Sequence, residues 1–210
     1  MKQSIHLTIT LVLSILWLSA CSSQPPQTVS YLLNTPEFEV IDDSMQKRVV
    51  VGDVEVASYL AGKSLTQALN NQQIHRSRQH QWAEPLHSQL QRQLRHGLTQ
   101  QLASSDWLPV AGSGHLRSYD LRLDLHIDSF HLLPNGEVEV AGIWQARNYQ
   151  QDFFASGRFS EHQQLAEDGY DAMVEALEIA WQRSMQEVAT QLLRTLNEAG
   201  EGSVNTDEGE

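Results

Sequence analysis

Residues 121–147 read LRLDLHIDSFHLLPNGEVEVAGIWQAR, and they carry the strongest structural signal in the chain. Apolar residues at 121, 123, 125 and 127 alternate with charged or polar ones, which predicts a strand with one buried face. Phe130 and Leu132 reverse the alternation, so we expect a β-bulge near Asp128. The turn Pro134-Asn135-Gly136 then predicts a hairpin whose return strand runs to about Tyr149.

Further strands are predicted on both sides of this hairpin. A strand at about 153–161 continues the meander, and upstream strands are expected at 28–33, 48–57 and 107–110. Asn70-Asn71 predicts a short hairpin between 65–69 and 73–76. Gly52 lies inside a Val-rich strand, where it indicates a bulge or a close backbone approach.

Two long helices are predicted. Leucines at 86, 90, 94, 98 and 102 form one apolar stripe, and Pro85 suits the first turn of that helix. The second helix spans about Tyr170 to Leu196, with Gly200 as its expected end. The predicted order along the chain is a group of strands, a helix, a strand meander and a second helix. This order predicts an α/β (α+β) fold: one mixed, largely antiparallel sheet with two long helices packed on it.

Length and charge narrow the class of protein. The chain has 210 residues, of which 40% are hydrophobic, enough for one domain with a single core. It has 26 acidic and 14 basic residues, a formal net charge of −12. A nucleic-acid partner is disfavoured, because a duplex binder needs a dense basic face.

We expect the domain at residues 29–199 and a disordered acidic tail at 200–210.

The first twenty residues predict an export signal. Leu7 to Leu18 is mainly apolar but has only 12 residues, too few to span a bilayer. Leu18-Ser19-Ala20-Cys21 resembles a bacterial lipobox, which implies cleavage of signal peptide 1–20 and lipidation of Cys21, the only cysteine. Residues 21–28 would be the tether, and Ser22 implies sorting to the outer membrane, facing the periplasm. The alternative is an ordinary cleaved signal peptide with a chance cysteine.

The sequence offers no recognisable catalytic set. It lacks the common hydrolase, zinc-protease and nucleotide-binding motifs, so we expect neither an enzyme nor a cofactor. Asp124, His126 and Asp128 share one face of the predicted strand and could in principle ligate a metal. We favour the alternative, the solvated face of a half-buried strand, because no further ligand is indicated.

The segment Gln81-Trp82-Ala83-Glu84-Pro85-Leu86 opens the first helix. Its simplest interpretation is that Trp82 packs on the core and fixes the start of the helix. Preceded by Tyr59-Leu60 and a polar hairpin, the segment also resembles the ABC-type transport auxiliary lipoproteins, the PqiC (YmbA) family. The strand at 121–125, the turn at Asn135-Gly136, the segment 138–144 and the closing helix extend the resemblance over about residues 31–196. Ala61-Gly62-Lys63 departs from the family pattern after the Tyr-Leu pair.

The resemblance implies a non-catalytic outer-membrane lipoprotein. Such a protein works with an MCE-domain periplasmic protein and an inner-membrane component in moving lipids between membranes. Tyr59, Trp82, Glu84 and Pro85 are then candidates for either partner contact or a structural role. We expect a homo-oligomer, with a monomeric tether as the alternative. The rival function is an envelope regulatory lipoprotein that binds and activates a peptidoglycan synthase.

Overall fold

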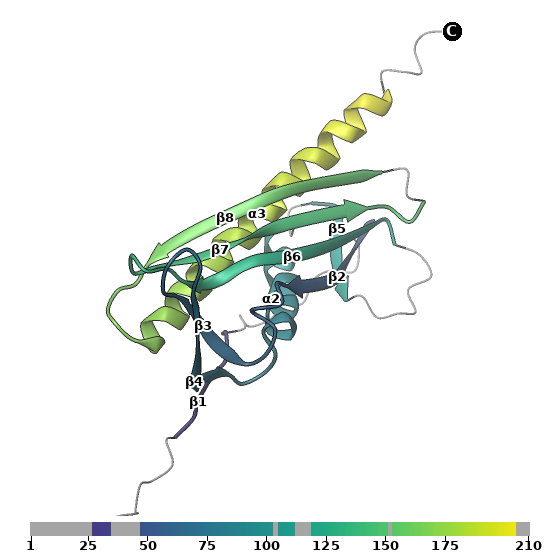
Figure 1. Ribbon diagram of the computed structural model, residues 1–210. Coiled ribbons are helices and arrows are strands. Elements are labelled where there is room, and N and C mark those ends of the chain that lie inside the picture. The colour runs from purple at the N-terminus through teal and green to yellow at the C-terminus, as the bar shows by residue number, and fades with distance from the viewer. Residues whose placement is uncertain (1–26, 35–46, 103–104, 112–118, 151–152, 205–210) are drawn as a thin grey trace, which may run out of the picture.

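The computed structural model describes residues 27–34, 47–102, 105–111, 119–150 and 153–204, and for 199–204 only the backbone. Figure 1 shows a sheet covered on one face by two helices. In chain order the elements are β1 (Val29–Tyr31), β2 (Lys47–Val56), β3 (Ser64–Ala68), β4 (Ile74–Trp82), α2 (Leu86–Gln101), β5 (Trp107–Ala111), β6 (Leu121–Leu132), β7 (Glu137–Arg147), β8 (Phe154–Gln164) and α3 (Tyr170–Val204).

Strand β6 organises the sheet. It pairs antiparallel with β7, which pairs antiparallel with β8, as the meander predicted. On its other edge β6 lies parallel to β2 and to one residue of β3. Pairings β2–β5 and β1–β4 are also parallel, and β3–β4 is an antiparallel hairpin. The mixed sheet is confirmed, but four of the seven pairings between described strands are parallel, so the prediction of a largely antiparallel sheet was wrong.

The parallel pairings have a physical reason. Short turns indicate antiparallel neighbours, whereas parallel neighbours need a long connection. Strands β3, β4 and helix α2 form the connection between β2 and its parallel neighbour β5. Nothing in the local sequence of β2 identifies the distant strands that flank it.

The core lies between the sheet and the two helices. The α2 leucines at 86, 90, 94, 98 and 102 are at most 1% exposed, which confirms the predicted stripe. Trp144, Phe130 and Phe159 of the sheet and Trp181 of α3 are buried among them. The opposite face of β6 carries Arg122, Asp124 and His126 and is only partly covered.

Several local predictions are confirmed, and two boundaries change. The register of β6 shifts between Ile127 and Ser129, and that of β2 shifts between Val51 and Val54, next to Gly52. Strand β4 is longer than predicted and ends at Trp82. Helix α3 continues to Val204, past the end expected at Gly200. A glycine inside a helix costs only about 1 kcal/mol relative to alanine, so Gly200 and Gly202 weaken the helix without ending it.

Some predictions concern other parts of the chain. The signal peptide, Cys21, most of the 21–28 tether and the last six residues of the acidic tail lie outside the described residues. Among the helices that are described, none is both long and apolar enough to cross a bilayer.

Candidate functional site

Trp82 joins the sheet to the first helix. It is the last residue of β4, it is 3% exposed, and its ring lies 6.0 Å from that of Phe130. The next residue, Ala83, donates its backbone N–H to the Tyr31 carbonyl at 2.8 Å, which ties the chain to β1 before the helix begins. The prediction that Trp82 is buried at the start of the helix is confirmed.

Glu84 and Pro85 form the turn into α2. Pro85 occupies the N-cap, where its missing N–H leaves no hydrogen bond unmade. The Glu84 carboxylate accepts a hydrogen bond from Arg92 at 2.9 Å, in a pair that is partly open to solvent. Such a pair stabilises a fold by roughly 1 kcal/mol or less.

Gln89 holds this turn from inside and was not predicted. It is fully buried, its Nε2 donates to the Glu84 carbonyl at 3.1 Å, and its Oε1 accepts from the Leu33 N–H at 2.9 Å. One side chain therefore links the turn, α2 and the segment after β1. The sequence signal for this role was the position of Gln89, a polar residue directly beside Leu90 of the leucine stripe.

Tyr59 lies on the turn after β2 and packs, partly buried, at the edge of the core. Its hydroxyl donates to the Asp128 carbonyl at 2.9 Å and lies 3.1 Å from Nδ1 of His131. Burial raises the pKa of Tyr59 and lowers the pKa of His131. A hydroxyl has one proton, and Tyr59 donates it to the Asp128 carbonyl. The hydrogen bond between Tyr59 and neutral His131 therefore needs a proton on Nδ1 of His131, which donates to the Tyr59 oxygen.

This pair makes stability depend on pH. Since the folded-state pKa of His131 is lowered, the unfolded chain takes up a proton first as the pH falls below about 6.5. The stabilisation is therefore complete above that pH and is lost progressively below it. We expect the unfolding free energy to decline less between pH 7 and pH 5 in His131→Gln than in the unmodified protein.

Urea unfolding across that pH range measures the effect. The control His87→Gln removes an exposed histidine and should keep the original pH profile. Burial also lowers the pKa of His96, so the His131→Gln variant retains part of the decline. Identical profiles for His131→Gln and the unmodified protein would contradict the assignment.

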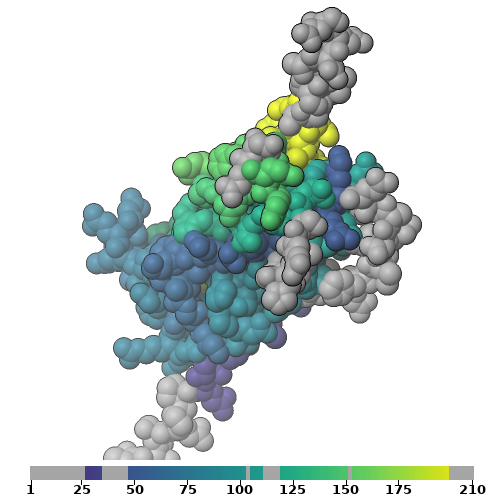
Figure 2. Space-filling view, turned by 90° about the vertical axis from the view of Figure 1, so that its right-hand side faces the viewer, coloured from purple at the N-terminus to yellow at the C-terminus, as the bar shows by residue number. Residues whose placement is uncertain are grey.

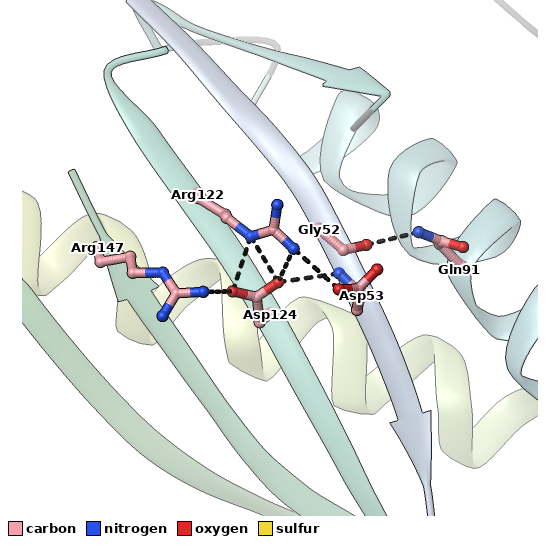
Figure 3. A network of polar contacts seen from close by, with 6 residues as sticks. All are labelled: Gly52, Asp53, Gln91, Arg122, Asp124 and Arg147. Carbon is pink, nitrogen blue, oxygen red and sulfur yellow. Dashed lines mark hydrogen bonds and ion pairs between the residues drawn. The ribbon is translucent and has the colours of Figure 1, made fainter. Parts of the chain in front are cut away.

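The partly covered face of the sheet carries a polar network (Figure 3). Asp124 on β6 accepts hydrogen bonds from the Arg122 Nε at 2.9 and 3.0 Å and from Arg147 of β7 at 3.0 Å. It also accepts from the backbone N–H of Asp53, at the bulge of β2. Arg122 reaches across to the Asp53 carboxylate at 3.0 Å, and hydrogen bonding to Asp124 raises its pKa. The sequence signal for this network was the presence of Arg122 and Asp124 at successive solvent-facing positions of β6.

The network also reaches the helical layer. Gln91 of α2 donates to the carbonyl of Gly52, at the β2 bulge, at 2.6 Å (Figure 3). A side chain at position 52 would collide with the Asp124 carboxylate, so only glycine allows this packing. The network joins β2, β6, β7 and α2, and it lines a cavity of about 350 Å³ with Glu55, His126 and Gln145.

The arrangement does not favour metal binding. The Asp124 carboxylate already accepts hydrogen bonds from Arg122, Arg147 and the backbone N–H of Asp53. His126 places Nδ1 3.6 Å from Glu55 and Nε2 3.5 Å from Asp128, so the two carboxylates lie at different nitrogens of the ring. Among the described residues no group of three or more His, Cys, Asp or Glu is placed to hold a metal ion, so Asp124, His126 and Asp128 are not brought together as one.

A second concave surface lies between the two helices. Gln93, Gln100 and Gln101 of α2 face Gln182 and Gln186 of α3 across a groove of about 350 Å³. Gln93 donates to the Asn34 carbonyl at 2.6 Å, while its Oε1 has no described hydrogen-bond partner. The lining is mostly neutral amide, which suits hydrogen bonding and provides no nucleophile or general base.

Comparison with known proteins decides the family. Residues 31–189 match the model of the ABC-type transport auxiliary lipoprotein component, which is most of the chain. The chain belongs to this family. It is therefore an auxiliary lipoprotein component of an ABC-type transport system, as the resemblance around Trp82 predicted.

Solved structures share the fold of this auxiliary lipoprotein. A crystal structure of an uncharacterised protein aligns with a TM-score of 0.68 at 24% identity, over 79% of this chain and 99% of that one. Protein XCC0632 from Xanthomonas campestris, a DUF330 protein, aligns with a TM-score of 0.66 at 13% identity, over 82% and 99%. No curated protein matches the sequence.

Proposed function

We propose that this auxiliary lipoprotein is a non-catalytic outer-membrane component of an MCE-type intermembrane lipid transport system. It would anchor or dock the periplasmic part of that system. The family match over residues 31–189 carries the proposal, because it covers strands β2 to β8, helix α2 and more than half of α3. The lipobox at Cys21 supports the anchor, and Ser22 supports the outer membrane as its site.

The polar surfaces of the domain are consistent with docking instead of chemistry. Tyr59, Trp82, Glu84 and Pro85 each have a packing or hydrogen-bonding role within the fold. Docking surfaces must then come from exposed parts of the domain, such as the amide groove between α2 and α3. We further propose that copies of the chain associate, with a monomeric tether as the alternative.

The lipid anchor predicts a clear result in cells. Labelled palmitate should enter the unmodified protein and the control variant Ser23→Ala, but not Cys21→Ser, because Cys21 is the only thiol. The Ser22→Asp variant should keep the label and move to the inner-membrane fraction. Label in Cys21→Ser would contradict the lipobox interpretation.

Capture from detergent-solubilised envelopes tests the function. The tagged, lipidated protein should recover an MCE-domain protein and its inner-membrane component after cross-linking. Recovery of a peptidoglycan synthase without an MCE-domain protein would instead support the regulatory alternative. Sedimentation of a chain starting at residue 21 with Cys21→Ser distinguishes an oligomer from a monomer.

A further inference from the structure

The β3–β4 hairpin differs in charge from the rest of the chain. Residues 56–83 contain Lys63, Arg76 and Arg78 and no acidic residue, although the whole chain carries 26 acids. Arg76 and Arg78 are exposed on β4, and neither they nor Lys63 form an ion pair with any described carboxylate. We call residues 63–81 the basic finger, since in Figure 2 this blue-to-teal segment projects from the left of the molecule.

The same region exposes apolar side chains. Leu69 and Ile74, on either side of the hairpin turn, are 56% and 41% exposed, and Val29 and Leu32, in and just after β1, are 43% and 55% exposed. Only two other large apolar side chains among the described residues are comparably exposed, Tyr149 and Phe154. Basic and apolar side chains together are typical of surfaces that contact anionic lipid headgroups and the outer acyl region.

The finger also lies beside the chain that leads to the predicted anchor. Strand β1 pairs in parallel with β4, and Val29 lies opposite His80, two residues from Arg78. Cys21 precedes Val29 by eight residues, a span of at most about 30 Å when extended. A lipid on Cys21 would therefore hold the finger within reach of the membrane, where weak contacts become effective because they are intramolecular.

Tyr31 of β1 and the start of α3 hold the base of the finger through His80. Asp171, at the start of α3, accepts a hydrogen bond from the Tyr31 hydroxyl at 2.9 Å, and Tyr31 is also 3.0 Å from His80. The neighbouring ring of Tyr170 stacks on His80 at 3.8 Å. These contacts hold the base of the finger on β1 and α3, while Arg76 and Ile74 lie farther along β4.

We infer that the basic finger contacts an anionic phospholipid surface and so fixes how the domain stands on the membrane that anchors it. This inference rests on the proposed anchor at Cys21. Lys63, Arg76 and Arg78 supply the charge, and Leu69 and Ile74 supply a shallow apolar contact. The remainder of the chain, which holds all 26 acidic residues, is repelled by the same surface and points away from it.

Tethered vesicles test the inference directly. A mature chain of residues 21–210, which keeps every described element, is coupled through Cys21 to a maleimide lipid. The vesicles contain either phosphatidylcholine alone or phosphatidylcholine with phosphatidylglycerol. Arginine modification by phenylglyoxal is then followed by mass spectrometry, with Arg158 on β8 and Arg194 on α3 as internal controls.

We expect Arg76 and Arg78 to react at least about five-fold more slowly on the anionic vesicles, the factor that corresponds to one basic residue held at such a surface. Arg158 and Arg194 should react equally on both. The protection should disappear in about 1 M salt, where screening is nearly complete. Equal rates at Arg76 and Arg78 on the two vesicle types, or equal protection of all four arginines, would overturn the inference.

Variants separate charge from folding. On the tethered chain, Arg76→Gln should leave the unfolding free energy unchanged and reduce the protection of Arg78 on anionic vesicles, while Arg76→Lys should retain that protection. Protection of Arg78 that is unchanged in Arg76→Gln would overturn the inference. The chemical tether replaces the natural acyl chains, so failure of the palmitate experiment would leave these results interpretable.

Discussion

Replacing Trp82 by Ala is expected to lower the free energy of unfolding by about 3–5 kcal/mol. The side chain is 3% exposed, lies against Phe130, and sits where β4 ends and the turn into α2 begins. Its loss removes buried apolar area and leaves a cavity at the point where the sheet and the helical layer meet. Urea unfolding followed by far-ultraviolet circular dichroism measures the change.

Trp107→Ala is the matched control for this prediction. Trp107 is only partly buried on β5, and its ring is partly covered by Lys47 at 5.3 Å. Truncation there should cost clearly less than at Trp82. If Trp82→Ala keeps the unfolding free energy of the unmodified protein and loses only its binding to envelope partners, Trp82 is a contact residue and the structural interpretation is wrong.

Replacing Gly142 by Ala is expected to cost about 3 kcal/mol, the upper part of the usual range for overpacking. Gly142 is buried in the middle of β7, opposite Ile127 on β6 and Phe159 on β8. An added Cβ would overlap the backbone carbonyl of His126 and lie 2.8 Å from the ring of Phe159. The carbonyl belongs to the β6–β7 pairing, so it cannot move aside without disturbing the sheet.

The control Gln145→Ala changes an exposed residue of the same strand and should alter the unfolding free energy by about 0.5 kcal/mol or less. A Gly142→Ala variant as stable as this control would show that the sheet opens easily at that point. Thermal unfolding by calorimetry gives an independent measure of both variants.

Local patterns accounted for most elements of the fold. The Leu121 alternation, the Asn135-Gly136 turn and the α2 leucine stripe each depend on residues that are close in sequence, and each is present in the structure. The parallel neighbours of β2 were not predictable, because Val49 meets Leu121 and Lys47 meets Trp107 across long stretches of chain. No short-range periodicity encodes such partners.

The site was less predictable than the fold. The motif at Trp82 and Glu84 was visible because it is contiguous, but its partners Gln89 and Arg92 act through three-dimensional contacts. The Asp124 network draws on β2, β6 and β7 together, so the strand pattern revealed only the polar character of that face. The charge of the basic finger could be related to the proposed anchor only once the β1–β4 pairing was known.

The place of β6 in the sheet has a consequence for the order in which the strands pair. The first strands cannot complete their pairing until β6 arrives, because β2 and β3 both lie against it and β2 precedes it by some 70 residues. Contacts of such high sequence separation form late and slow the folding rate. The outer-membrane location proposed above requires export. A chain that crosses a membrane N-terminus first would then keep its early strands unpaired until most of the protein has passed.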